Sequence, residues 1–319
     1  MEIEIAGGAP PVLRITADNP SPMTAEGTNS FLVGREALAL IDPGPEDAAH
    51  LAAMKDAAGG RPVFGVFVTH SHLDHSAGAQ AAAEALGAPI LAFGDHHAGR
   101  RAVMRRLAEA EGAAAGLGGG EGADLSFAPD RRLADDEIAA PPNGEPWRLR
   151  ALHTPGHTAN HLSFALEAAD GEAYALFCGD HVMAWSTSIV SPPDGDMGAY
   201  MASLARLAAR DDPLFLPAHG ATIAEPQARL AELIAHRKGR EAAALAALES
   251  GAKTPAELAR AIYRALDPRL LPLAERNMLA HLIDLWERGR AAPEGGRVGA
   301  AARFALTSAR EPGSDSRSE

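Results

Sequence analysis

Residues 63–75, VFGVFVTHSHLDH, join a continuous apolar run to a cluster of ionisable side chains. The apolar run, Val63 to Thr69, is typical of a strand buried on both faces. The side chains that follow within six residues are all of types that ligate metal ions: His70, His72, Asp74 and His75. A lone histidine in such a place is usually structural, but burying four ionisable groups without a metal would be costly. The stretch therefore predicts a metal site at the end of a buried strand.

Three other junctions between a strand and a turn carry side chains of the same kind. The sequence TPGHT at 154–158 is a tight Pro-Gly turn that presents His157. The run FCGD ends at Asp180 just past an apolar strand, and LPAHG places His219 in the same way. At each junction the sequence runs in the same order, from an apolar strand through a turn to a side chain that can bind metal. We therefore expect all seven side chains to lie at one edge of a sheet.

The sequence around these junctions alternates short apolar runs with helical stretches. Further strands are expected at about 11–16, 30–34, 37–42, 149–153, 162–166, 174–178 and 214–217, and helices at about 46–57, 77–86, 96–111 and 197–209. The helix at 96–111 would begin with His96 and His97, which we interpret as solvated. We interpret its pairs Arg100-Arg101 and Arg105-Arg106 as a solvated face too, with contact to an anionic substrate as the alternative.

The chain becomes helical after residue 224. Helices are expected at 225–249, 254–266 and 272–289, and a short β-ribbon at 297–307. Thr254-Pro255-Ala256-Glu257 is a strong start signal, with Thr as N-cap, Pro at the first helical position and Glu closing a capping box. Three helices and a ribbon are typical of a winged helix. We predict a catalytic domain at 1–224, a helical winged-helix-like domain at 225–308 and a disordered tail at 309–319.

The composition of the 319 residues is that of a globular protein, with 46% hydrophobic and 22% charged residues. The single cysteine, Cys178, excludes an intramolecular disulfide and a cysteine-based zinc cluster. No apolar run reaches the roughly 18 residues of a membrane helix, so we expect no membrane partner. The acidic N-terminus lacks the features of a signal peptide, and we expect a cytoplasmic location.

The charge is distributed unevenly along the chain. The net charge of −13 argues against coating nucleic acid or membrane by bulk electrostatics. Residues 1–236 hold 15 basic and 31 acidic residues, whereas residues 237–304 hold 12 basic and 8 acidic ones. The acidic residues 1–236 argue against a long polyanion as ligand of that part. The basic excess of residues 237–304 keeps nucleic acid possible as a partner.

The HxHxDH run, the TPGH turn, the Gly-Asp after a strand and the PxHG turn together resemble the metallo-β-lactamase-fold hydrolases. Their order and spacing agree over about residues 15–225. The resemblance implies an α+β fold, an αββα sandwich, followed here by the small winged-helix-like domain. It also implies two divalent metal ions, one held by His70, His72 and His157 and the other by Asp74, His75 and His219, with Asp180 bridging them. Zinc is the expected metal, and five histidines and two aspartates with no thiolate also suit iron or manganese.

Two stretches of sequence indicate one branch of that superfamily. Residues 19–24, NPSPMT, and 27–34, GTNSFLVG, resemble the lactamase-beta-like proteins, which carry a C-terminal winged helix and include a single-strand endoribonuclease. Hydroxyacylglutathione hydrolases share the seven ligands but end in a different helical domain. Their glutathione-binding residues find no counterpart here.

The resemblance implies a hydrolase in which a metal-bridging hydroxide attacks an ester, thioester or related acyl substrate. Asp74 would orient that hydroxide. By resemblance His161 faces the cleft and donates to the developing oxyanion, with a structural histidine as the alternative. The segment from Trp185 to Tyr200 is predicted to contact substrate.

Two other functions stay open on the sequence alone. The first is an endoribonuclease or phosphodiesterase with the same metal centre, acting on single-stranded RNA. The second is a nucleic-acid-binding regulatory protein whose lactamase-like domain is a scaffold, although a scaffold would not need all seven ligands. A small-molecule substrate is the expected partner, and the sequence leaves the oligomeric state undetermined.

Overall fold

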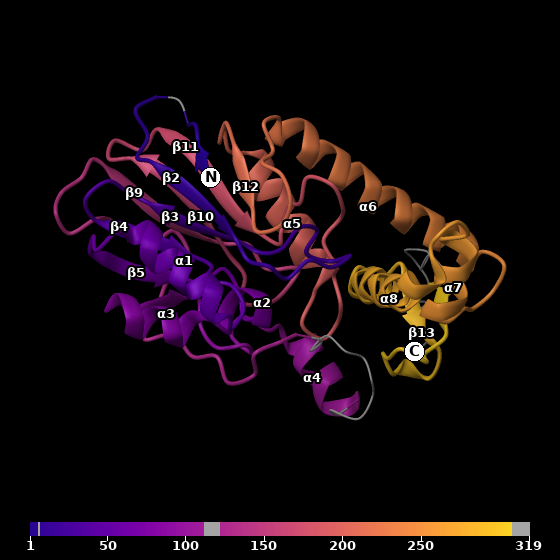
Figure 1. Cartoon of the computed structure of the whole chain (residues 1–319). Coiled ribbons are helices and arrows are strands. Elements are labelled where there is room, and N and C mark those ends of the chain that lie inside the picture. The colour runs from indigo at the N-terminus through magenta and orange to yellow at the C-terminus, as the bar shows by residue number, and fades with distance from the viewer. Residues whose placement is uncertain (6, 112–121, 308–319) are drawn as a thin grey trace, which may run out of the picture. The chain divides into compact units, whose positions relative to one another are not determined.

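The computed structural model describes residues 1–5, 7–111 and 122–307 (Figure 1). The chain divides into two compact units, Met1–Arg237 and Lys238–Glu319. The division falls within helix α6 (Pro226–Leu248), which begins close to the predicted start of the second domain. The predicted disordered tail, residues 309–319, lies outside the described residues.

The first unit contains a seven-stranded mixed sheet formed by consecutive strands of the described chain. Neighbouring strands pair antiparallel from β1 to β4 and parallel from β4 to β7. The strands are β1 (Glu2–Ile3), β2 (Val12–Thr16), β3 (Asn29–Val33), β4 (Leu38–Ile41), β5 (Val63–Phe67), β6 (Ile90–Ala92) and β7 (Arg131–Arg132). β5 is the strand predicted from the VFGVFVT run, and it lies inside the sheet between β4 and β6.

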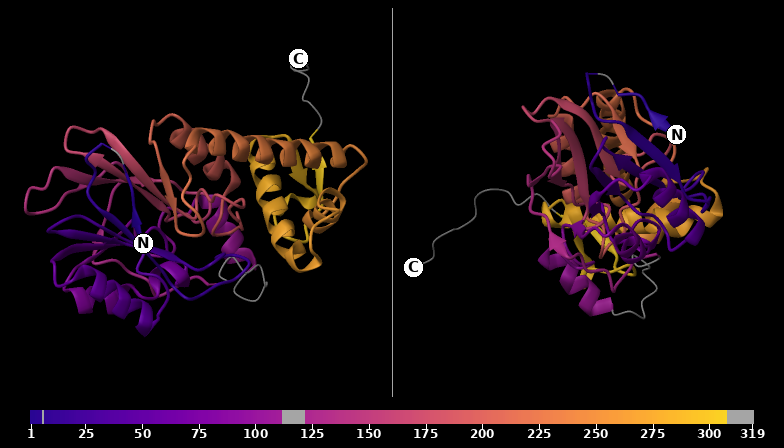
Figure 2. Two further views of the ribbon diagram at one scale, coloured as in Figure 1. Left: turned by 45° about the horizontal axis from the view of Figure 1, so that its top comes forward. Right: turned by 60° about the vertical axis from the view of Figure 1, so that its left-hand side comes forward.

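A five-stranded sheet in the order β12-β11-β10-β9-β8 faces the first one (Figure 2). β8 to β11 pair antiparallel, and β12 joins β11 in parallel. The strands are β8 (Ile138–Ala139), β9 (Trp147–His153), β10 (Leu162–Ala168), β11 (Ala173–Gly179) and β12 (Phe215–Pro217). Strands β9, β11 and β12 run in one direction, so their carboxyl ends meet at one edge of the sheet.

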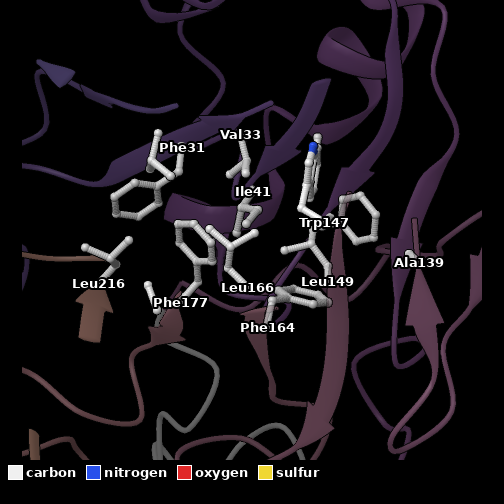
Figure 3. Packing of buried hydrophobic residues seen from close by; sticks show 14 of the residues in the cluster. Phe31, Val33, Ile41, Ala139, Trp147, Leu149, Phe164, Leu166, Phe177 and Leu216 are labelled. Carbon is white, nitrogen blue, oxygen red and sulfur yellow. The ribbon is translucent and has the colours of Figure 1, made fainter. Parts of the chain in front are cut away.

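An apolar core fills the space between the two sheets. Phe31 of β3 packs on Phe177 of β11 with ring centroids 5.0 Å apart (Figure 3). Phe67 of β5 packs on Phe164 of β10 with ring centroids 5.4 Å apart. All four rings are almost entirely buried. Because each ring removes about 150–250 Å² of surface from water, the two sheets are held firmly together. The junctions at the ends of β5, β9, β11 and β12 therefore have a rigid support.

Helices complete the sandwich on the outer faces. Helices α1 (Ala48–Ala58) and α3 (Ala79–Leu86) cover the seven-stranded sheet, where Met54 and Ala82 share a second apolar cluster with Val66. Helix α5 (Met197–Ala208) lies beside the five-stranded sheet (Figure 1). The αββα sandwich predicted from the sequence is confirmed.

The second unit is helical and ends in a ribbon. Helices α7 (Pro255–Ile262) and α8 (Leu271–Glu287) pack together, and Thr254 and Glu257 form the predicted capping box. The ribbon pairs β13 (Ala291–Pro293) with β14 (Phe304–Leu306), so it starts earlier than the predicted 297. The segment 294–303 joins the two strands, and near its start it contains Gly295 and Gly296, both of which have positive φ.

The predicted start of the fourth helix is wrong. Helix α4 (Ala102–Glu111) begins six residues after position 96. The carboxylate of Asp95 accepts the His97 N–H (3.0 Å), and the Asp95 carbonyl accepts the Ala98 N–H (3.0 Å). Gly99 then has a φ of +78°, so this segment forms turns instead of a helix.

No helix in the described residues combines the length and apolar character needed to cross a bilayer.

Candidate metal centre

The structure brings the seven predicted ligands into two adjacent groups. The first group is His70, His72, His157 and Asp180, and the second is Asp74, His75 and His219. Within each group, one ligand atom per residue lies within 4.8 Å of all the others. The residues come from the ends of β5, β9, β11 and β12, so the common strand-to-turn order does place them at one edge. The short helix α2 (Leu73–Ser76) carries Asp74 and His75.

Three imidazole nitrogens converge in the first group. His72 Nδ1 lies 2.9 Å from His70 Nε2 and 3.1 Å from His157 Nε2. The opposite nitrogens of two rings are held in place, because His70 Nδ1 lies 3.0 Å from Thr69 Oγ1 and His157 Nδ1 donates to the Ile189 carbonyl (2.7 Å). Such outer contacts orient histidine ligands and select their tautomer.

The second group surrounds the carboxylate of Asp74. Asp74 Oδ2 lies 3.2 Å from His219 Nε2 and 3.5 Å from His75 Nε2. On the far side of the His75 ring, Nδ1 lies 2.9 Å from Asp42 Oδ2. The side chain of Asp74 is 29% exposed, whereas that of His75 is fully buried. This group therefore has a buried imidazole and one carboxylate that is partly open to solvent.

The carboxylate of Asp180 faces both groups. Its Oδ2 lies 3.6 Å from His157 Nε2 in the first group, and its Oδ1 lies 3.2 Å from His219 Nε2 and 3.5 Å from His75 Nε2 in the second. One carboxylate thus has an oxygen for each group. This is the position a bridging ligand needs.

Unsatisfied buried atoms show that the residues fit metal ions. Within the described part of the chain, His75 Nε2 and Asp180 Oδ1 are buried and make no hydrogen bond. Burying polar atoms without partners is costly, and a cation between them would satisfy both. Together with the histidine nitrogens that face one another, this donor set fits two divalent ions.

Sequence reasoning missed Asp42. This residue follows β4, the strand beside β5, and its carboxylate accepts from Thr69 N (2.7 Å) and Thr69 Oγ1 (2.8 Å) and contacts His75 Nδ1. Asp42 therefore holds the start of the ligand loop and orients one ligand. The run LALID at 38–42 shows the same order of apolar strand and carboxylate as the other junctions, which is the signal that could have revealed it.

The surroundings of the ligand histidines shift their pKa values in opposite directions. Burial and the neighbouring His157 lower the pKa of His72 to about 3. Burial likewise lowers the pKa of His70 well below its usual range. Burial alone would also lower the pKa of His219, but Asp180 and Asp74 outweigh it and raise that pKa to about 9. Burial would lower the pKa of His75 as well, but Asp74, Asp180 and Asp42 raise it well above its usual range. Without metal at pH 7, His70 and His72 are therefore neutral, and His75 and His219 carry protons.

This separation predicts proton release on metal uptake. Histidine binds a metal only in its neutral form, so metal-free protein at pH 7 should release about two protons when both sites fill. The release should shrink as the pH passes about 9, because His219 has then lost its proton already. A pH indicator in weakly buffered solution measures this. His219→Ala should release about one proton fewer, and metal uptake at pH 7 with no proton release would contradict the prediction.

The amino-acid sequence matches two known protein families. The description "Metallo-beta-lactamase superfamily" matches residues 23–219. The chain belongs to the metallo-β-lactamase superfamily. The description "Beta-lactamase associated winged helix domain" matches residues 254–299. The superfamily and the winged-helix extension predicted from the sequence are confirmed.

Several relatives in the metallo-β-lactamase superfamily are similar over most of the chain. A "Lactamase-like protein adaB" of Aspergillus niger is 32% identical over 241 residues, which cover 75% of this chain and 64% of that protein. An "Atrochrysone carboxyl ACP thioesterase" of Passalora fulva is 30% identical over 266 residues, 80% of this chain and 68% of that protein. The chain thus spans about two thirds of the length of these curated relatives.

Solved structures of the superfamily show the same fold. A beta-lactamase domain protein from Burkholderia ambifaria matches with a TM-score of 0.73 and 25% identity, over 96% of this chain and 93% of that one. A metallo-beta-lactamase family protein from Thermus thermophilus matches with a TM-score of 0.68 and 24% identity, over 92% of this chain and 98% of that one.

His161 lies beside the first ligand group, with its ring centroid 5.2 Å from that of His70. Its side chain is fully buried. Its Nδ1 lies 2.9 Å from Thr154 Oγ1, and its Nε2 accepts the Asp180 N–H at 3.3 Å. The sequence left open a cleft-facing donor and a structural histidine, and these contacts favour the structural histidine. We interpret His161 as a positioning residue for the Asp180 main chain.

The prediction that His96 is solvated is wrong. His96 is 3% exposed, and its Nδ1 lies 3.0 Å from the hydroxyl of Ser71, the residue between His70 and His72. Its Nε2 lies 3.1 Å from Asp194 Oδ1. The prediction for Arg100 is also wrong, because this side chain is buried and ion-paired with Asp194. Asp194, the partner of both side chains, is 98 residues from His96 and 94 residues from Arg100 along the chain, so no local pattern predicts either contact. His97 is exposed, as predicted.

Gly156 is required by the turn that presents His157. Its φ is +148°, and a Cβ there would lie 2.4 Å from the Tyr200 Cα. Side-chain contacts shorter than about 3 Å do not occur, and the neighbour is backbone, so the turn or helix α5 would have to move.

We expect Gly156→Ala to destabilise the protein by about 2–4 kcal/mol and to weaken metal binding at the first group. Urea unfolding and metal titration measure the two effects. Gly239→Ala is the matched control, since no atom lies within 4 Å of the new methyl group and the residue is inside helix α6. Unchanged stability and metal content in Gly156→Ala would refute the role given to this turn.

Proposed function

We propose that this chain is a binuclear metal-dependent hydrolase of acyl thioesters and related acyl esters. The observation that carries the proposal is the carboxylate of Asp180, which turns one oxygen to each ligand group. Two cations bound there would activate water and polarise the oxygen on which negative charge develops. We propose zinc as the metal, with iron or manganese as the alternatives that the oxygen and nitrogen donors admit.

We assign Asp74 the role of orienting the attacking water. Its carboxylate is the exposed member of the second group and lies beside Thr28, whose hydroxyl donates to Asp74 Oδ2 at 3.4 Å. Burial alone would raise the pKa of Asp74, but His75 and His219 lower it below the usual range. Asp74 is therefore ionised at neutral pH and can accept a hydrogen bond from water, which would orient that water.

An acyl substrate is supported by charge and by similarity. The residues 1–236 carry a strong excess of acidic groups, which disfavours a long polyanion. The relative from Passalora fulva carries the name of an acyl carrier protein thioesterase. We therefore propose a small thioester or ester as the substrate, and a cytoplasmic location, which the single buried thiol of Cys178 suits.

A panel of substrates tests the proposed reaction. Purified, metal-analysed protein is assayed with an S-acyl N-acetylcysteamine thioester, a nitrophenyl ester, bis-nitrophenyl phosphate and a single-stranded RNA. We expect turnover of the thioester and the ester, which is lost in His157→Ala and kept in His97→Ala, whose exposed imidazole is the matched control. Turnover of the phosphodiester or RNA alone would overturn the acyl proposal in favour of a nuclease.

A further inference from the structure

Two consecutive residues in the chain between β11 and α5 contact two of the metal ligands. Ser188 Oγ donates to the main-chain carbonyl of Asp180 (2.5 Å). The Ile189 carbonyl accepts from His157 Nδ1 (2.7 Å). Asp180 and His157 both belong to the first ligand group. Because Ser188 and Ile189 are neighbours in the chain, a shift of this pair would disturb both ligands together.

Arg237 of helix α6 holds this pair in place. Its Nη2 donates to the Ser188 carbonyl. Its guanidinium carbon lies 5.1 Å from the centroid of the Tyr200 ring, and the Tyr200 hydroxyl donates to the carbonyl of His181 (3.1 Å). All of these residues belong to the first unit. Both contacts of Arg237 therefore reach the stretch of chain that directly follows Asp180.

The burial of Arg237 makes its contact with Ser188 strong. The residue is 2% exposed, and Ser188 is 1% exposed. An arginine is almost never buried this deeply unless it is paired, because taking a charge out of water is costly. Hydrogen bonds from a charged donor are stronger than those between neutral groups. Removal of the guanidinium would leave a buried carbonyl without this donor, so we expect Ser188 to shift.

A second arginine of α6 attaches an earlier part of the same stretch. Arg229 Nε donates to the Met183 carbonyl (2.8 Å), and its Nη2 donates to the Ser186 carbonyl. These contacts do not depend on Arg237. We therefore expect a variant without the Arg237 guanidinium to fold, with the change confined to the region of Ser188.

We propose that Arg237 and Ser188 are positioning residues for the first metal site. Arg237 fixes Ser188, whose hydroxyl holds the main chain of Asp180. The adjoining Ile189 carbonyl orients the ring of His157 and selects its tautomer. Arg237 and Ser188 act through these ligands and not by holding a metal themselves. The inference rests on the proposed binuclear centre.

Zinc affinity tests the role of Arg237. The purified, metal-free full chain is titrated with zinc in competition with a chromophoric chelator. We expect Arg237→Met to lower the affinity about 10–100-fold, the usual cost of losing an outer contact of a metal ligand. Arg237→Lys should recover part of the loss, because an ammonium can still donate to the Ser188 carbonyl. Lys238→Met, which removes a cation from the exposed next position of α6, should leave the affinity unchanged.

Ser188→Ala tests the second contact of the chain of interactions, and it decides the matter if Arg237→Met does not fold. The substitution removes one hydroxyl and leaves the carbonyl that Arg237 binds. We expect the zinc affinity to fall about tenfold or more. The double variant should lose less than the product of the separate losses, because both residues act on the same pair.

Thermal scans of the metal-free proteins separate positioning from plain stabilisation. A purely structural role would lower Tm and leave the zinc affinity of the folded protein unchanged. That result in Ser188→Ala or Arg237→Met would overturn the inference and leave the hydrolase proposal intact. Separate losses that simply multiply in the double variant would overturn the joint action of the two residues. A wild-type chain that binds no metal would overturn the proposed metal centre, and this inference with it.

Discussion

Asp180→Asn is expected to lower kcat/KM for an acyl thioester by about a thousandfold or more. Each oxygen of Asp180 faces one ligand group, and both are separated from histidine nitrogens by 3.2–3.6 Å. An amide is neutral and offers only one good acceptor oxygen, so it cannot serve both groups. Loss of metal stabilisation worth several kcal/mol corresponds to three or more powers of ten in rate.

Steady-state kinetics and metal analysis measure the effect of Asp180→Asn, with circular dichroism to show that the variant is folded. Asp56→Asn is the matched control, because Asp56 is exposed on α1 and remote in sequence from every ligand. Full activity and two bound metals in Asp180→Asn would contradict a bridging role. Reduced activity in Asp56→Asn would show that the effect is not specific.

Removal of metal with a chelator is expected to abolish turnover and to lower Tm by about 10 °C. Seven ionisable side chains meet at this edge, and His75 Nε2 and Asp180 Oδ1 are buried there without a hydrogen bond from any described residue. A tightly bound ligand stabilises the folded state by about 4 kcal/mol at a thousandfold excess over Kd, which corresponds to a shift of this size in a domain of this length.

Thermal scans and assays before and after dialysis against dipicolinate measure this loss, with zinc-saturated dipicolinate as the control. Zinc, iron and manganese are then returned separately, and we expect zinc to restore the most activity. Full activity in protein shown to be metal-free would disprove the proposed chemistry. Best recovery with iron or manganese would correct the metal and leave the site in place.

Much of the fold could be predicted from the sequence because its signals are local. The apolar run 63–69 predicts β5 without knowledge of any other residue, and the Thr254–Glu257 signal predicts the start of α7. The ribbon was misplaced because its first strand is only Ala291–Pro293, too short to stand out. The helix at 96–111 was extended too far because the turn made by Asp95 competes with helix formation.

The ligand positions could also be predicted, because each follows an apolar strand and strands of one direction end at one edge. The surroundings of the ligands could not. Asp194 meets Arg100 and His96 only after the 193–196 loop has folded against the segment before α4, and nothing local in either stretch indicates the other. His161 is four residues from a ligand, yet its burial depends on Thr154 and on the Asp180 main chain. Pairings of this kind are properties of the packed fold.

Anomalous diffraction from crystals of the metal-loaded protein tests the central claim most directly. The account predicts two peaks, one at the nitrogens of His70, His72 and His157 and one at Asp74, His75 and His219, each within about 2.2 Å of an Asp180 oxygen. A single peak, or peaks that do not share Asp180, would contradict it.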